Sequence, residues 1–334
     1  MDQTTGLKQP QRYQEMADPQ VRPRYTGIAT FFRAPAGDSP ADADVALIGV
    51  PFDGGVTHRS GARHGPRAVR EQSALLRRHN PATGANPFDD ARVRDLGDCW
   101  IEHPFELTGA HREIEAFLGR VVGAGAVPLC VGGDHSITLP ILRAVAKDQP
   151  LGLVHIDAHP DTGGDYMGSR YHHGAPFSRA VEEGLLDPRR CIQIGIRGTT
   201  NDPGLWGFSE REGMRVVSMD EFADKGWRWA AEEARRVVGE GPAYLSYDID
   251  SLDPAFAPGT GTPEAGGLTT VEALRLVRAL AGLDVIAADL VEVAPSWDPS
   301  YVTAFNGASI LYEILCVLVA ARGERARREV GASS

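Results

Sequence analysis

Six short, nearly continuous apolar runs are the feature that most constrains the fold of this 334-residue chain. They are rich in Val and Ile, and they lie at residues 44–50, 127–131, 151–156, 191–196, 243–249 and 285–293. Runs of this length, apolar at successive positions, are typical of parallel strands that are covered on both faces. The sequence therefore predicts a buried, mostly parallel β-sheet.

Segments with the helical spacing of apolar residues alternate with these runs. Residues 113–122, 139–146, 271–280 and 302–319 each predict a helix. Because strands and helices alternate without a break in composition, the pattern predicts a single α/β domain over residues 27–321. A polar N-terminal arm at 1–26 and a polar C-terminal tail at 322–334 are expected to flank this domain.

Charge and cysteine content narrow the classes of partner and location. The chain carries 34 Lys and Arg against 45 Asp and Glu, a formal net charge of −11, which argues against a nucleic acid or an anionic membrane as the main partner. The longest apolar stretch, 314–321, is far shorter than the roughly 20 residues that span a bilayer. No apolar signal core is visible near residue 1, and the 4 cysteines are scattered, so we expect a cytoplasmic protein with reduced thiols.

Polar clusters follow four of the predicted strands. They read GGDHS at 132–136, DAHPD at 157–161, DID at 248–250 and VEVAP at 291–295. In an open parallel sheet, ligands bind in the crevice outside the carboxyl ends of the strands. We therefore expect the four clusters to converge at one edge of the sheet.

Imidazole and carboxylate side chains in these clusters predict a metal site. The candidate ligands are His135, Asp157, His159, Asp161, Asp248 and Asp250. Four ionised carboxylates in a partly buried cleft repel one another strongly, and two divalent cations would neutralise them. A carboxylate-rich set favours Mn²⁺ over structural zinc, while Ni²⁺ also suits these ligands. Two such ions about 3.5–4 Å apart lower the pKa of a shared water, which is hydrolase chemistry.

Together, these motifs resemble those of the ureohydrolases, the family of arginase, agmatinase and the guanidino-acid hydrolases. The matching segments include GGDHS, DAHPD, SYDIDSLDP with PGTGTPEAGGLT, EVAP, VPFDGG at 50–55 and RSGARHGP at 59–66. The resemblance extends from Arg24 to Ala320 and implies a three-layer αβα sandwich with an eight-stranded, mostly parallel sheet. It also implies a homo-oligomer, a trimer or hexamer, with a hetero-oligomer containing a homologue as the alternative.

The resemblance implies a role for each candidate residue. One metal ion would be held by His135, Asp157, Asp161 and Asp248, and the other by His159, Asp157, Asp248 and Asp250. His173 corresponds to the histidine that transfers protons, with His172 as its competitor, and Glu292 corresponds to the carboxylate that holds the substrate guanidinium. His155 is expected to form a hydrogen bond near the ligands rather than to bind metal.

The implied reaction releases urea and an amine from a guanidino compound, with agmatine as the first choice of substrate. Asp165 or Asp298 would suit the amine of agmatine, whereas Arg170 would suit the carboxylate of a guanidino acid such as 4-guanidinobutyrate. Trp297 either lines the substrate pocket or covers the sheet edge. If it shortens the pocket, a small guanidine or a biguanide becomes the alternative substrate.

Two other functional classes are disfavoured by the same residues. A deacetylase with a single zinc would not need the second Asp of DAHPD together with the Asp248 and Asp250 pair. A non-catalytic partner subunit would not need a complete set of six ligands.

Overall fold

The computed structural model describes residues 23–200 and 206–332 of the chain, and most of the predicted N-terminal arm lies outside them. Within this part of the chain, eight strands form one sheet in the order β2-β1-β3-β8-β7-β4-β5-β6, and every pair of neighbours is parallel. The strands are β1 (Val45–Val50), β2 (Val93–Asp98), β3 (Val127–Gly132), β4 (Leu151–Ile156), β5 (Leu186–Ile196), β6 (Arg215–Ser218), β7 (Ala243–Asp248) and β8 (Val285–Val291). The predicted parallel eight-stranded sheet is confirmed.

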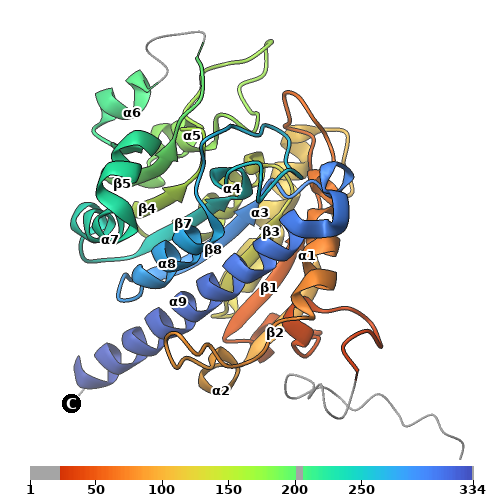
Figure 1. The fold of residues 1–334 in the computed structure, drawn as a ribbon. Helices are drawn as coiled ribbons and strands as arrows, with labels where there is room; N and C mark the ends of the chain where they lie inside the picture. Colours follow the sequence, from red (N-terminus) through yellow and green to blue (C-terminus); the bar gives the residue numbers. More distant parts are fainter. Residues whose placement is uncertain (1–22, 201–205, 333–334) are drawn as a thin grey trace, which may run out of the picture.

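Helices cover both faces of this sheet and complete three layers (Figure 1). The described helices are α1 (Gly65–Ser73), α2 (Pro87–Asp90), α3 (Leu107–Gly123), α4 (Thr138–Val145), α5 (Pro176–Glu182), α6 (Gly207–Glu212), α7 (Met219–Val238), α8 (Thr270–Ala279) and α9 (Val302–Ala332). Helices α1, α7, α8 and α9 share one apolar core, whereas α3, α4 and α5 share the other. The αβα sandwich is therefore confirmed as well.

Helix α9 is long and apolar enough to cross a membrane by length and composition, but 78% of its apolar window is buried inside the fold. It is thus a core helix that packs on β8, α1 and α8. It continues past the predicted end at Val319 to Ala332. Arg322 and Arg325 in this extension form ion pairs with Asp44 and Asp284, which directly precede β1 and β8. These ion pairs fix the polar end of the helix to the rest of the fold.

Sequence pattern identified the buried strands but missed the two outer ones. Strands β2 and β6 form the edges of the sheet. The sequence of β2 is VRDLGD, with exposed and half-buried positions, and β6 has only four residues. An edge strand needs an apolar side chain on one face only, so neither segment shows a continuous apolar run.

A close approach between two loops shapes the edge of the sheet where the polar clusters lie. Gly133, directly after β3, has a φ of 31°. A Cβ at this position would lie 2.2 Å from the carbonyl oxygen of Phe52 and 2.6 Å from that of Val50. Only glycine permits this contact, which brings the loop after β1 against the GGDHS segment.

This crowding leads to a stability prediction. We expect Gly133→Ala to destabilise the fold by at least about 1 kcal/mol more than Gly125→Ala, because overpacking adds to the backbone strain that both variants share. Gly125 has a φ of 84° but nothing within 4 Å of an added Cβ, which makes it a matched control. Thermal unfolding of both variants measures the difference, and equal midpoints would contradict the packing argument.

Candidate metal centre

The four polar clusters lie together because their strands are neighbours. Strands β3, β8, β7 and β4 are adjacent in the middle of the sheet. Since all four are parallel, the segments that follow them emerge at the same edge. The sheet thus brings GGDHS, VEVAP, DID and DAHPD to one place, as the strand-end argument predicted.

Three carboxylates surround one ring nitrogen in the first group of candidate ligands. His135 Nδ1 lies 3.2 Å from Asp157 Oδ2, 2.9 Å from Asp161 Oδ2 and 3.2 Å from Asp248 Oδ2. Donor atoms about 2.1 Å from one ion and at right angles to each other are separated by about 3 Å, so these separations suit octahedral ligands of a shared ion. The sequence-predicted set for one metal is thus together in the structure.

A second group adjoins the first through Asp157. His159 Nδ1 lies 3.0 Å from Asp250 Oδ2 and 3.5 Å from Asp157 Oδ1. Asp157 therefore faces one group with each of its two oxygens. Asp248 lies with the first group, and it accepts the Asp250 N–H at 2.8 Å through Oδ1.

The donor set fits a pair of divalent cations. His135 Nδ1 is buried and makes no hydrogen bond within the described part of the chain, and its position among three carboxylates fits a shared ion. Burial raises the pKa of Asp248 well above its usual range, and the charges of Asp250 and Asp157 add to the effect. Burial likewise raises the pKa of Asp250 to about 6. The raised pKa values mean that the neighbouring carboxyl groups do not all ionise readily, and cations between them would lower these pKa values again.

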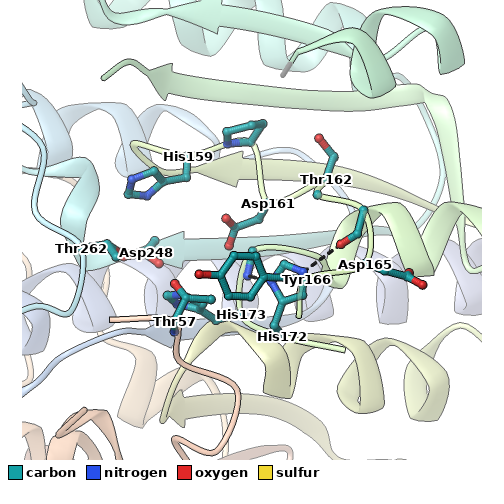
Figure 2. A pocket seen from close by; sticks show the side chains of 14 residues that line it. Thr57, His159, Asp161, Thr162, Asp165, Tyr166, His172, His173, Asp248 and Thr262 are labelled. Atoms are coloured by element: carbon teal, nitrogen blue, oxygen red, sulfur yellow. Dashed lines mark hydrogen bonds between the residues drawn. The ribbon is translucent and has the colours of Figure 1, made fainter. Parts of the chain in front are cut away.

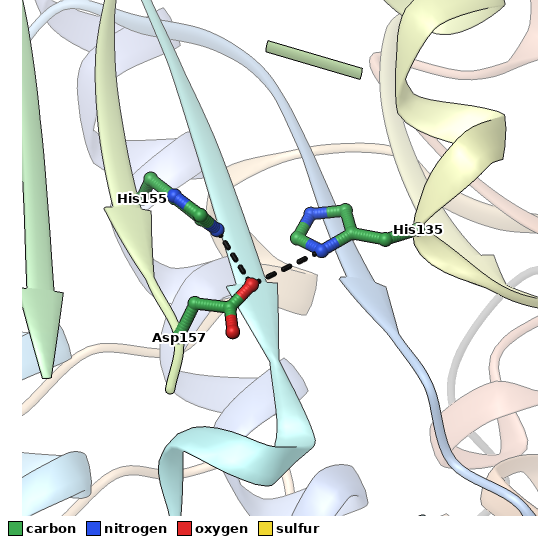
Figure 3. Close-up of side chains that lie close together, drawn as sticks. All are labelled: His135, His155 and Asp157. Atoms are coloured by element: carbon green, nitrogen blue, oxygen red, sulfur yellow. Dashed lines mark hydrogen bonds and ion pairs between the residues drawn. The ribbon is translucent and has the colours of Figure 1, made fainter. Parts of the chain in front are cut away.

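A chain of hydrogen bonds that starts at Ser209 orients Asp157. His155 and Asp157 lie 2.7 Å apart through Nε2 and Oδ2, with His135 on the other side of the same oxygen (Figure 3). The Gln193 amide lies 3.0 Å from His155 Nδ1, and the Ser209 hydroxyl donates to Gln193 Oε1 at 2.7 Å. Since Oε1 accepts, the Gln193 amide N–H is left to donate to Nδ1, and the ring donates through Nε2. His155 thus holds Asp157 in place, and hydrogen bonds engage both of its ring nitrogens.

Glu292 lies directly beside the first group. Its Oε1 accepts the backbone N–H of His135 at 2.8 Å and contacts His173 Nδ1 at 2.9 Å. Its Oε2 is buried and has no hydrogen-bond partner among the residues that the structure describes. Glu292 has a φ of 66°, a left-handed conformation that is uncommon outside glycine and that aims the side chain back towards GGDHS. One free carboxylate oxygen beside the ligands is suited to a cationic group.

The surroundings of His173 act on its two protonation states in opposite directions. Burial opposes its protonation, but Glu292 raises the pKa of the ring to about 9. The backbone N–H of Thr57 donates to Nε2 at 3.1 Å, which favours the neutral ring. His172, by contrast, uses both nitrogens within its own loop, at 2.9 Å from the Gly164 carbonyl and 3.2 Å from the Gly174 N–H. Of the two histidines, His173 is the one that contacts Glu292.

A cavity of about 360 Å³ opens onto both groups (Figure 2). Its described lining includes His159, Asp161, Asp248 and His173 on the metal side, and Asp165 and Tyr166 on the outer side. The outer loop turns at Met167 and Gly168, which have φ values of 48° and 82°. Paired hydrogen bonds of 2.9 Å between Tyr166 and Ser169 close this turn.

The charged residues predicted to hold the far end of a substrate already have partners. Arg170 is 2.5 Å from Glu182, and Asp165 is 3.2 Å from Arg179. Asp298 is buried and accepts the backbone N–H groups of residues 303 and 304 at 2.9 and 3.0 Å. None of the three faces the cavity as an unpaired charge among the described residues.

Trp297 and Arg59 form a small stack. Trp297 is 46% exposed and donates its indole N–H to the Ser60 carbonyl at 2.9 Å. The Arg59 guanidinium lies 5.0 Å from the Trp297 ring and has no ion pair with a described acid. The Arg59 carbonyl lies 3.0 Å from a Cβ built on Gly261, and Glu292 Oε2 lies 3.5 Å from the same point. Arg59 was not among the predicted site residues, and its only sequence signal is its place at the start of RSGARHGP.

The chain is similar to known proteins over most of its length. Residues 43–317 match the model of the arginase family. The chain is 53% identical to guanidinopropionase of Pseudomonas aeruginosa, over 89% of this chain and 93% of the relative. It is 47% identical to mitochondrial agmatinase of Gallus gallus, over 88% and 87%. Among solved structures, proclavaminate amidino hydrolase from Streptomyces clavuligerus has a TM-score of 0.86 and 42% identity, over 90% of this chain and 99% of that one.

The geometry predicts how many metal ions a single substitution removes. We expect Asp157→Ala to abolish binding at both positions, since each of its oxygens faces one group, whereas Asp250→Ala should spare the first position. Mass spectrometry of protein dialysed against limiting Mn²⁺ counts the ions per chain. Asp165→Asn at the rim of the cavity is the control and should keep both ions. Two ions retained by Asp157→Ala would contradict the shared role of this residue.

Proposed function

The chain belongs to the arginase family, and from that premise we propose that it hydrolyses a guanidino C–N bond in a small carboxylate-bearing substrate. The products would be urea and an amino acid. The observation that carries the proposal is the buried Oε2 of Glu292, which has no hydrogen-bond partner in the described part of the chain and lies beside the candidate metal ligands. Agmatine is the second candidate substrate, because an agmatinase is among the close relatives.

The six candidate ligands would hold two divalent ions, and we propose Mn²⁺ because the set is rich in carboxylates, with Ni²⁺ as the alternative. When bound, the ions supply an acidified water that can attack carbon at neutral pH. The protein's part is to fix the ligands in place. Asp157 is held by His155 and by the His159 N–H at 2.6 Å, and Asp248 is held by the Asp250 N–H.

Glu292 would bind the guanidinium and position its carbon. A guanidinium carbon is a poor electrophile because its positive charge is spread over three nitrogens, so placement contributes much of the rate. Oε2 would accept N–H groups of the substrate, while the His135 N–H and His173 fix Oε1. The carboxylate is thus held in its orientation before the substrate arrives, which is the condition for electrostatic preorganisation.

His173 would supply the proton that the departing amine needs. Its pKa is raised by Glu292, while the Thr57 N–H favours the neutral ring. A ring that is drawn towards both protonation states can receive a proton and release it within one turnover. The Thr57 hydroxyl, 2.7 Å from Nε2, lies where a proton would enter or leave.

Arg59 favours a substrate that ends in a carboxylate. The two acids predicted to bind the amine of agmatine already have partners: Asp165 pairs with Arg179, and Asp298 accepts hydrogen bonds from backbone N–H groups. The Arg59 guanidinium, by contrast, is stacked on Trp297 and has no acidic partner among the described residues. A guanidinium of this kind binds a carboxylate with two parallel hydrogen bonds.

We further propose that the protein works in the cytoplasm as a homo-oligomer. The 4 cysteines are free in the structure, in line with a reducing compartment. Trp100 and Phe105 are 79% and 98% exposed. Large apolar side chains at such exposure favour contact with another subunit.

Urea release tests the proposed reaction. Protein reconstituted with Mn²⁺ or Ni²⁺ would be given 3-guanidinopropionate, 4-guanidinobutyrate, agmatine, arginine, guanidine and a biguanide. We expect one guanidino acid to dominate, and Glu292→Gln to lower its kcat/KM by at least about 100-fold while both metals stay bound. Two bound metals with no urea from any substrate would instead support the non-catalytic partner subunit.

Arg59 provides the test of substrate class. We expect Arg59→Gln to raise KM for the guanidino acid by about 10–100-fold, which corresponds to the loss of a charge-assisted hydrogen bond. The KM for agmatine should not rise. Arg170→Gln is the matched control, because its guanidinium pairs with Glu182, and its KM values should not change. An equal effect of Arg59→Gln on both substrates would show that the residue only supports its loop.

A further inference from the structure

Asp289 is a fully buried carboxylate in the middle of β8 that no cation neutralises among the described residues. Three hydroxyl groups satisfy it instead. Oδ1 accepts from Ser246 at 2.7 Å, and Oδ2 accepts from Thr138 and from Tyr244, each at 2.6 Å. Burying a negative charge in this way is costly even when hydrogen bonds satisfy it, so the residue calls for a reason beyond packing.

Ser246 connects Asp289 to the first group of metal ligands. Ser246 and Asp289 are direct partners in the pairing of β7 with β8. The Ser246 hydroxyl has one proton, and Asp289 accepts it. Ser246 Oγ, 2.8 Å from His135 Nε2, must therefore accept a hydrogen bond from that ring nitrogen.

This chain of hydrogen bonds sets the tautomer of His135. A neutral imidazole carries a single N–H, and Ser246 draws it to Nε2. The lone pair then lies on Nδ1, the atom that is surrounded by Asp157, Asp161 and Asp248. A metal ion needs that lone pair, and a proton on Nδ1 would occupy its place.

We propose that Asp289 is a positioning residue that acts through Ser246 and keeps His135 in its metal-binding tautomer. This inference rests on the proposed metal centre and on no particular substrate. A carboxylate is suited to the task because, when ionised, it can only accept hydrogen bonds, so all three hydroxyls must point towards it. An amide would present an NH₂ group and force one hydroxyl to reverse.

The test is Asp289→Asn, which preserves shape and removes the charge. An amide oxygen in the place of Oδ2 keeps the hydrogen bonds from Thr138 and Tyr244, so the NH₂ group should face Ser246. The Ser246 hydroxyl proton then turns to His135 Nε2, and the imidazole proton moves to Nδ1. Calorimetric titration of metal-free protein with Mn²⁺ should show affinity at one site lowered by about 10–100-fold, with the His159 site unchanged. Tyr244→Phe is the matched control, because it removes another hydroxyl from the same carboxylate, and its affinities should stay within about 2-fold of wild type.

A double substitution separates this role from a merely structural one. Ser246→Ala should lower the metal affinity of the same site. Adding Asp289→Asn to it should cause no further loss of affinity, because Asp289 acts on His135 only through Ser246, and we call this chain of hydrogen bonds the relay. Losses that multiply, or wild-type affinity in Asp289→Asn, would overturn the inference. If Asp289→Asn does not fold, Ser246→Ala compared with Thr138→Val decides, since only the former touches His135.

The titration also separates this inference from the proposed function, because it uses Mn²⁺ and no guanidino compound. A wild-type protein that binds two ions but releases no urea would leave the relay standing and remove the proposed reaction. A wild-type protein that binds no divalent ion would remove the relay together with the metal centre.

Discussion

The repulsion among carboxylates at the centre of the sheet is the constraint on which the site depends. Asp157, Asp161, Asp248 and Asp250 are all buried, at the ends of two neighbouring strands. Burial and mutual repulsion push the pKa of Asp248 upwards, so cations are required to keep the set ionised. Backbone N–H groups and His155 hold oxygens of Asp157, Asp248 and Asp250 in fixed directions, which means that much of the charge is organised before any ion binds.

Backbone conformation contributes to the same organisation. Asp161 and Glu292 have φ values of 48° and 66°, and each such residue costs on the order of 1–3 kcal/mol. The surrounding hydrogen bonds offset this: the Glu292 N–H donates to the Gly133 carbonyl, and the Phe177 N–H donates to the Asp161 carbonyl. Strain of this kind persists because the sheet and α5 determine the positions of both residues. The left-handed backbone at Asp161 and Glu292 redirects the chain after each strand, so that the two side chains point towards the same site.

The sequence was sufficient to predict the six inner strands of the sheet and the side chains that gather at their carboxyl ends, because both follow from local patterns. Apolar runs locate the buried strands, and polar residues directly after them locate the edge. The supporting residues could not be found in this way. Ser246 and Asp289 face each other across β7 and β8, but register between strands distant in sequence is set by tertiary packing. In the sequence, Asp289 is an acid inside an apolar run, which indicates that it has a hydrogen-bonding partner in the core but not which residue that partner is.

The far end of the substrate illustrates a second limit. Arg170, Asp165 and Asp298 suggested opposite substrates in sequence, yet ion pairs and backbone hydrogen bonds engage all three. Charge near a site becomes informative only when the partners of each group are known.

The balance of charge in the cavity then favours a substrate with one cationic end over a substrate with two. Four ligand carboxylates would be neutralised by two divalent ions, and Glu292 would be neutralised by the guanidinium. Among the described residues that line the cavity, Asp165 is the remaining acid, and Arg179 already pairs with it. An ammonium group at the outer end would find no free anion among these lining residues. A carboxylate is the group that we propose for the Arg59 guanidinium, which stacks on Trp297 and has no acidic partner among the described residues. We therefore assign the guanidinium end of the substrate to the strand ends of the sheet, and we propose that the loops after β1 and β4 select the charge at the other end.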